Sequence, residues 1–133
     1  SYDGSVYSLD ARTGKIIWYM DYGSSKKAVV EGKVLYLAVN SGLVYALNKE
    51  NGRVLWKFEL DRGSPTELIL KGNYLAFGSS QEYFYVLHKG DGSLAYRYDV
   101  GLRSGFVANP VLSGREMFAV SNFGNLYVFK WLR

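Results

Sequence analysis

The sequence contains no cysteine, which excludes three kinds of chemistry from these 133 residues. Disulfide bonds, thiol nucleophiles and cysteine-ligated metal centres all require a thiol group. The compartment stays open, because proteins without disulfides are found in the cytosol and also outside it. The absence of cysteine therefore limits the chemistry of the chain and not its location.

Histidine, proline and long apolar runs are also scarce. His88 is the only histidine, so a Ser-His-Asp arrangement has a single candidate base. No uncharged apolar run approaches the roughly 18 residues of a membrane-spanning helix. The sequence shows neither the spacing of a metal site nor a phosphate-binding glycine loop. We therefore expect no catalytic residue, no cofactor, no metal and no membrane span.

Aromatic residues are abundant instead, with 12 Tyr, 7 Phe and 3 Trp, and 48% of the chain is hydrophobic. Packed β-sheets select such side chains and offer room for their rings. The formal charge of +4 is mild for this length. Solvated lysines account for it, so it indicates no nucleic-acid partner.

One stretch, Gly42 to Phe58 (GLVYALNKENGRVLWKF), organises the rest of the chain. Two apolar runs flank a polar turn that ends in Asn51-Gly52, and this pattern predicts a β-hairpin, because glycine accepts a positive φ angle. Closely similar stretches recur along the chain, at Gly4 to Met20, at Glu82 to Tyr98 and, as a half unit, at Gly124 to Trp131.

The spacing of the copies indicates a repeat of about 40 residues. Equivalent tyrosines, Tyr7, Tyr45, Tyr85 and Tyr127, are separated by 38, 40 and 42 residues. A second hairpin lies between the copies, around turns at Gly32, Gly72 and Gly114. Four short strands in such a period are the dimensions of one blade of a β-propeller.

We therefore predict an all-β fold, a β-propeller of four-stranded antiparallel blades. The chain would form a single partial domain, 1–133, with about 3.25 blades. Strands are labelled A to D within a blade, and residues 1–22 would supply strands C and D of an incomplete blade. Two full blades would follow at 28–61 and 66–100, and 109–133 would supply strands A to C of a last blade.

A propeller needs about four blades or more to close, so this chain requires further blades. They would come from a larger propeller, in the same or another polypeptide, or from a homo-oligomer. Strand counting disfavours a simple dimer, because A, B and C from one end plus C and D from the other give five strands. We expect the chain to be one portion of a larger propeller.

The segment from Ser8 to Trp18 resembles the tryptophan-docking motif of the PQQ-like propellers, the quinoprotein alcohol dehydrogenase-like family. The resemblance implies that each tryptophan packs between adjacent blades, with its ring on a glycine turn and its N–H on a backbone carbonyl. His88 takes the motif position of Asp10 and Asn48, which implies a structural role for it. The motif positions are Asp10, Thr13, Gly14, Trp18, Asn48, Gly52, Trp56, Gly92 and Tyr96.

For function, the resemblance implies a non-enzymatic scaffold or protein-interaction module, similar to barrel-assembly lipoproteins or to sensor-type propellers. It favours a periplasmic, extracellular or cell-surface location. Two alternatives stay open: a fragment of a quinone-dependent dehydrogenase, and a structural repeat protein with no discrete ligand. We match none of the residues with which those dehydrogenases hold calcium and quinone.

A candidate binding site follows from the order of the strands. In an up-and-down sheet the B–C turns and the D-to-A connections lie at one end, and the longer connections of a rigid frame often carry binding residues. Basic residues recur in these connections, which predicts a rim for an anion or an acidic protein or peptide partner. The predicted rim consists of Lys26, Lys27, Arg62 and Arg103.

Overall fold

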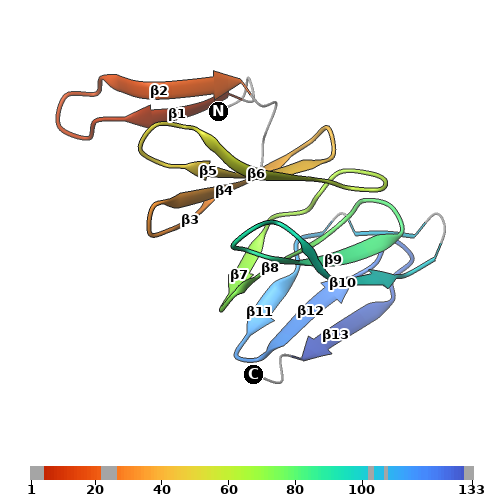
Figure 1. The fold of residues 1–133 in the computed structure, drawn as a ribbon. Coiled ribbons are helices and arrows are strands. Elements are labelled where there is room, and N and C mark those ends of the chain that lie inside the picture. The colour runs from red at the N-terminus through yellow and green to blue at the C-terminus, as the bar shows by residue number, and fades with distance from the viewer. Residues whose placement is uncertain (1–4, 22–26, 102–103, 107, 131–133) are drawn as a thin grey trace.

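The computed structural model describes residues 5–21, 27–101, 104–106 and 108–130, and within these ranges every regular element is a β-strand (Figure 1). The all-β prediction is confirmed. The strands are β1 (Ser5–Leu9), β2 (Ile16–Asp21), β3 (Val29–Glu31), β4 (Val34–Val39), β5 (Leu43–Asn48), β6 (Val54–Glu59), β7 (Ile69–Lys71), β8 (Tyr74–Gly78), β9 (Tyr83–His88), β10 (Leu94–Asp99), β11 (Val111–Ser113), β12 (Glu116–Val120) and β13 (Leu126–Lys130).

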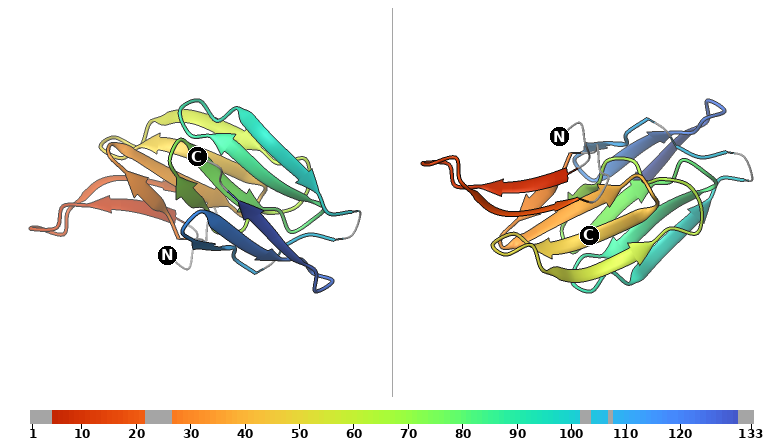
Figure 2. Two further views of the ribbon diagram at one scale, coloured as in Figure 1. Left: turned by 90° about the horizontal axis from the view of Figure 1, so that it is seen from below. Right: turned by 90° about the horizontal axis from the view of Figure 1, so that it is seen from above.

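These strands form four antiparallel sheets, and each strand pairs only with its neighbours in sequence. The sheets are the hairpin β1-β2, the two four-stranded sheets β3-β4-β5-β6 and β7-β8-β9-β10, and the three-stranded sheet β11-β12-β13. They follow one another in space in chain order, and the views from below and above show them fanned against each other (Figures 1 and 2). This is the blade arrangement of a propeller.

The turn between β5 and β6 shows why this sequence forms tight hairpins. Asn48 Oδ1 accepts the Glu50 N–H at 2.8 Å, and the Asn48 carbonyl accepts the Gly52 N–H at 2.7 Å. Gly52 has a φ of 76°, which suits a residue without a Cβ. The turn between β1 and β2 repeats the first bond, with Asp10 Oδ1 accepting the Arg12 N–H at 2.8 Å. Asx side chains thus close these turns on themselves.

The main core lies between the two four-stranded sheets. Their central strands are buried on both faces, as expected for sheets with neighbours on either side. Tyr85 and Phe77 stack with ring centroids 5.4 Å apart, and Phe58 meets Tyr85 edge-on at 5.5 Å. The buried members of this cluster are Tyr36, Ala38, Val44, Ala46, Leu60, Leu68, Leu75, Phe77, Tyr85 and Leu87.

A second core joins the sheet β7–β10 to the sheet β11–β13. Alternation along β8 and β9 divides the two cores, because neighbouring residues of a strand point to opposite faces. Phe77 belongs to the first core, while Ala76 and Phe84 belong to the second. The ring of Phe84 stacks on Phe129 of β13 at 4.7 Å. The two central strands of this middle sheet therefore pack against both neighbouring blades.

The terminal sheets leave large apolar side chains exposed. On β2 these are Ile16, Ile17 and Tyr19, and on the last sheet Leu126 is 61% exposed. Monomers rarely tolerate broad apolar patches, so such faces indicate contacts with further structure. The exposed apolar residues of these two sheets are Tyr7, Leu9, Ile16, Ile17, Tyr19, Val111, Val120, Leu126 and Val128.

The loops sort into two ends. The A–B and C–D turns lie on the left in Figure 1, and the remaining loops lie on the right. The A–B and C–D turns of one blade contact each other, since the Lys49 N–H donates to the Lys33 carbonyl at 2.9 Å. We call these ends the turn face (10–15, 31–33, 48–53, 71–73, 88–93 and 113–116) and the connection face (27–28, 40–42, 59–68, 79–82, 99–101, 104–106, 108–110 and 121–125).

Candidate functional site

The loops of the connection face are bonded to one another across blades. The Ser80 N–H of the β8–β9 loop donates to the Ser64 carbonyl of the preceding connection at 2.8 Å. The Asn122 N–H of the last sheet donates to the Gly105 carbonyl at 2.7 Å, and its side-chain amide reaches the Ser80 carbonyl at 3.3 Å. Bonds between loops of three successive sheets hold this surface in one arrangement.

Glu82 is the most unusual residue of the connection face. It has a φ of 70°, while every other described residue with a positive φ is glycine. Its N–H is bonded to the Ser104 carbonyl, and its carbonyl accepts the Val100 N–H at 2.7 Å, so the two bonds hold this backbone in place. Such a conformation costs on the order of 1 kcal/mol or more in a residue with a Cβ.

The Glu82 carboxylate is also buried, with its side chain only 10% exposed. Oε2 lies 3.7 Å from Nε of Arg62 but has no hydrogen-bond partner among the described residues. Ser104 Oγ, on the neighbouring loop, is also buried and also has no hydrogen-bond partner among the described residues. Buried polar atoms of this kind are uncommon and costly.

Asp61 joins two blades at the edge of the connection face. Its Oδ2 accepts the Tyr85 hydroxyl at 3.1 Å and the Arg97 guanidinium at 2.7 Å. The Arg97 guanidinium also lies 4.4 Å above the ring of Tyr83. Burial, with the Asp61 carboxylate as a smaller cause, raises the pKa of Tyr85 to about 12. The hydrogen bond to Asp61 raises the pKa of Arg97.

The structure describes two of the four residues of the predicted basic rim. Lys26 and Arg103 lie outside the described residues, and Lys27 is exposed. Arg62 is 57% exposed and pairs with Glu82. The rim stays a prediction.

Acidic side chains outnumber basic ones in the part of the connection face that the structure describes. Besides Lys27 and Arg62, the described charges there are five carboxylates. The sequence carries a signal for three of them, because Glu59, Asp61 and Asp99 lie at or just after the ends of D strands. The five are Glu59, Asp61, Glu67, Glu82 and Asp99.

The predicted docking tryptophans lie near the other end. Nε1 of Trp18 donates to the Lys49 carbonyl at 2.7 Å, and Nε1 of Trp56 donates to the Lys89 carbonyl at 2.8 Å. A Cβ on Gly52 would lie 2.9 Å from ring carbons of Trp18. The ring therefore needs a glycine beneath it, and each hairpin is tied to the next blade.

Two other positions of the docking motif, Thr13 and Tyr96, and the turn residue Asp91 beside Gly92 differ in their contacts. Thr13 Oγ1 accepts the Lys15 N–H at 3.3 Å within its own turn. Tyr96, which follows Trp18 and Trp56 in the repeat, is 49% exposed. In the third turn, Asp91 Oδ1 accepts the N–H and the hydroxyl of Ser93, and these bonds lower the pKa of Asp91.

The described residues form neither a metal-binding cluster nor a membrane-spanning helix. Among the described parts of the chain, no three His, Cys, Asp or Glu side chains gather closely enough to hold a metal ion. The exposed His88 ring lies 5.5 Å from the ring of Tyr74 and belongs to no such group. No helix suited to crossing a bilayer occurs in those parts either.

Antiparallel four-stranded sheets in chain order, with a tryptophan docked on the glycine turn of the next blade, define the PQQ-like β-propeller class. The resemblance noted from the motif is confirmed. The family model described as outer membrane protein assembly factor BamB matches residues 2–100. The chain belongs to this family.

Relatives in sequence carry the same description. The chain is 29% identical over 129 residues to the outer membrane protein assembly factor BamB of Shewanella oneidensis, covering 96% of this chain and 32% of the relative. It is 29% identical over 128 residues to that of Escherichia coli K12, covering 96% and 32%. The chain thus spans about a third of the length of the curated relatives it matches.

Solved structures agree on the fold. The crystal structure of BamB from Moraxella catarrhalis matches 96% of this chain and 40% of that chain, with a TM-score of 0.81 and 24% identity. The computationally designed Ika4 protein matches 96% of this chain and 80% of its own, with a TM-score of 0.76 and 19% identity. At these identities the likeness shows the propeller fold alone.

Proposed function

We propose that the chain is part of a non-enzymatic propeller scaffold that binds other proteins, and that its connection face is the binding surface. The observation that carries the proposal is the family match over residues 2–100, whose relatives are outer membrane protein assembly factors. An assembly factor acts through contacts with other proteins. A surface whose loops are bonded across blades is suited to such contacts, because little ordering entropy is lost on binding.

Within this proposal Lys26, Lys27, Arg62 and Arg103 remain the candidate rim. The buried Glu82 carboxylate supports a role for Arg62. The Arg62 guanidinium lies 3.7 Å from this carboxylate, and more than half of the Arg62 side chain is exposed to solvent. Arg62 can therefore contact a partner without leaving Glu82. An acidic group on the partner would share the guanidinium.

The exposed apolar faces support a second part of the proposal. We propose that further blades of the same, longer protein cover the face of β1-β2 and the face of β11-β13. The solution mass of residues 1–133 alone, measured by light scattering, tests this part. Aggregation that disappears when the flanking segments are restored is the expected result, and a stable monomer with exposed faces would contradict it.

The binding surface itself is tested by photo-crosslinking in the full-length protein. A photoreactive residue is placed at Lys27 or Arg62, with Lys57 on the outer strand β6 as the control position. We expect adducts with a component of outer membrane protein assembly from the two connection-face positions only. With the photoreactive residue kept at Lys27 or Arg62, replacement of the other three rim residues by serine should abolish the adducts. Adducts that persist in this variant would overturn the proposal.

A further inference from the structure

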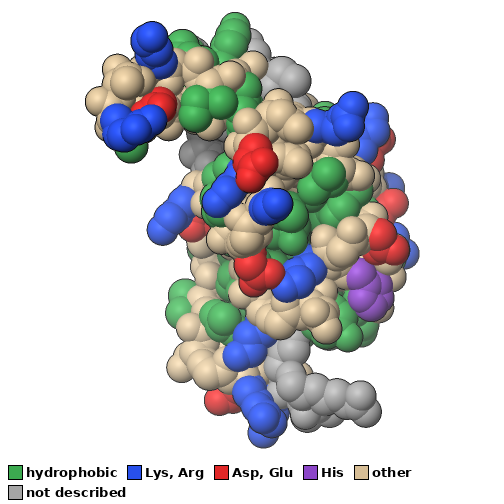
Figure 3. Space-filling view, turned by 60° about the vertical axis from the view of Figure 1, so that its left-hand side comes forward, with side chains coloured by type: hydrophobic (Ala, Val, Ile, Leu, Met, Phe, Trp, Pro, Cys, Tyr) green, Lys and Arg blue, Asp and Glu red, His purple; other side chains and the backbone are tan. Residues whose placement is uncertain are grey.

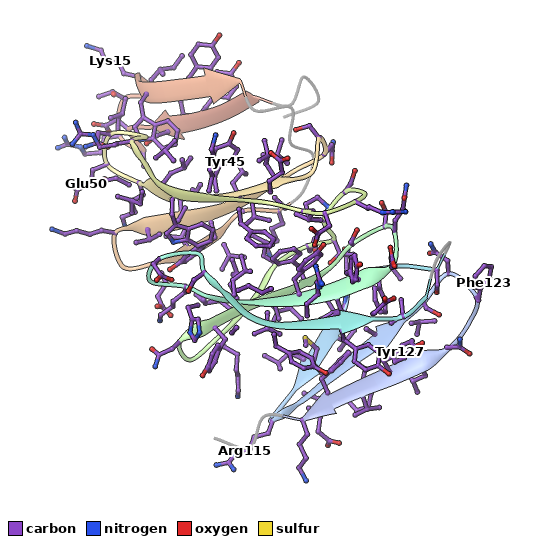
Figure 4. The ribbon with its side chains drawn as sticks, turned by 45° about the vertical axis from the view of Figure 1, so that its right-hand side comes forward. Lys15, Tyr45, Glu50, Arg115, Phe123 and Tyr127 are labelled. Atoms are coloured by element: carbon purple, nitrogen blue, oxygen red, sulfur yellow. The ribbon has the colours of Figure 1, made fainter. Side chains whose placement is uncertain are left out.

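The positive charge of the chain is concentrated on the turn face, at the end opposite to the proposed binding surface. Figure 3 looks toward this end and shows Lys and Arg side chains from the β1-β2 hairpin at the top to the bottom of the molecule. Figure 4 places Lys15, Glu50 and Arg115 away from Phe123 of the connection face. The basic residues of the described turns are Arg12, Lys15, Lys33, Lys49, Arg53, Lys71, Lys89 and Arg115.

Five acidic residues share this face, but three of them are engaged within it. Glu31 pairs with Lys89 of the next blade. Asp10 and Asp91 accept hydrogen bonds from their own turns. Glu50 and Glu116 are left, against six basic side chains that form no ion pair with any described residue. These six are Lys15, Lys33, Lys49, Arg53, Lys71 and Arg115.

The basic side chains stand on a connected frame. The Lys49 N–H bonds to the Lys33 carbonyl within one blade, and the Lys71 ammonium donates to the Gly114 carbonyl of the next sheet at 2.8 Å. The tryptophans tie the same turns together from below, through the Lys49 and Lys89 carbonyls. Charges held at fixed spacings raise the affinity for an oppositely charged chain, because less freedom is lost on binding.

From this arrangement we propose that the turn face binds an acidic polypeptide segment of a partner protein, which lies across the turns of consecutive blades. A polypeptide fits better than a lipid surface for two reasons. The turn tips lack the large apolar side chains that insert into a bilayer. Glu50 and Glu116 stand among the cations and would be repelled by a uniformly anionic surface, whereas a peptide can place its own basic or neutral residues beside them.

The proposal is tested with the full-length protein and a fluorescent peptide of about ten glutamates, by anisotropy at low salt and at about 0.15 M salt. The variant Lys33→Gln/Lys49→Gln removes two charges from the turn face and leaves the backbone bonds of both residues in place. Lys57→Glu changes the net charge equally, but on the outer strand β6. We expect about a fivefold loss of affinity for the double variant and less than about a twofold loss for the control.

Three results would overturn the proposal: no peptide binding at low salt, equal losses for the two variants, or binding of phosphatidylglycerol vesicles in place of the peptide with the same dependence on Lys33 and Lys49. The serine variant of the connection-face rim separates this site from the proposed function. It should lose its crosslinks and keep its peptide affinity, so either hypothesis can fail alone.

Discussion

The indole of Trp56 lies on Gly92 of the next blade and donates its N–H to the Lys89 carbonyl at 2.8 Å. One side chain of β6 thereby holds the β9–β10 turn by a ring contact and by a hydrogen bond. Trp18 holds the β5–β6 turn in the same way, with Gly52 beneath its ring and the Lys49 carbonyl as its acceptor. Neighbouring blades are connected at the turn face by these repeated pairs.

Trp56→Ala should lower the free energy of unfolding by roughly 3 to 5 kcal/mol, because a large half-buried ring and its hydrogen bond are both lost. Trp56→Phe keeps most of the ring and removes only the N–H donor, so it should cost about 1 kcal/mol in addition to the lost area. Urea denaturation of the full-length protein measures both values. A loss below about 1 kcal/mol for the alanine variant would mean that Trp56 is not what joins these blades.

Gly92→Ala should destabilise the protein by about 2 kcal/mol or more, since Gly92 has a φ of 74° and a Cβ there would overlap the ring of Trp56. Gly90 provides a matched control in the same turn, because a Cβ on it would meet nothing within 4 Å. Gly90→Ala should change stability by less than about 1 kcal/mol. Thermal unfolding compares the two variants, and similar effects at both positions would refute the explanation.

Stability should fall as the pH rises from about 10 to about 12, because the pKa of Tyr85 is raised to about 12 in the folded protein. The unfolded chain releases this proton near pH 10, whereas the folded protein retains it, so the contribution is complete below pH 10 and disappears toward pH 12. Tyr85→Phe should show a smaller decline over this range. The measurement is the free energy of unfolding at several alkaline pH values, and equal slopes in the two proteins would contradict the assignment.

Glu82→Gly should stabilise the protein by about 1 kcal/mol, because it removes both the positive φ of a residue with a Cβ and the buried carboxylate without a hydrogen-bond partner. Glu82→Ala removes the carboxylate and keeps the unfavourable φ, so it separates the two contributions. Denaturant midpoints of the three proteins suffice. If glycine destabilises the protein instead, the carboxylate makes a favourable interaction that outweighs the cost of its backbone.

Much of the fold could be predicted because its signals are local. Asn51-Gly52 between two apolar runs predicts a hairpin from neighbouring residues alone. The repeat of about 40 residues indicates how many blades the chain contains. Antiparallel strands joined by short turns leave few alternative orders, so the succession of sheets followed as well. The docking motif was identified from Asp10, Thr13, Gly14 and Trp18 at their characteristic spacing.

The connections were less predictable, because their residues act through contacts with loops far away in sequence. Arg62 could be read as a free cation, whereas folding brings it to Glu82, 20 residues further along. The inward position of that carboxylate depends on a backbone angle that nothing near Glu82 in the sequence indicates. The turns carry more basic residues than the connections do, and which of these charges are paired depends on the fold.

The sequence by itself therefore determined the strands, the tight turns, the blade period and the family, since each of these depends on residues close to one another in the chain or on simple repetition. Tertiary structure alone decided which carbonyls receive the tryptophans, which carboxylates are engaged and which face carries the excess of positive charge. The physical reason is that hydrogen bonds and electrostatic interactions depend on distance in space. The hydrogen bonds from Trp56 to the Lys89 carbonyl and from Lys71 to the Gly114 carbonyl form only once neighbouring sheets have packed.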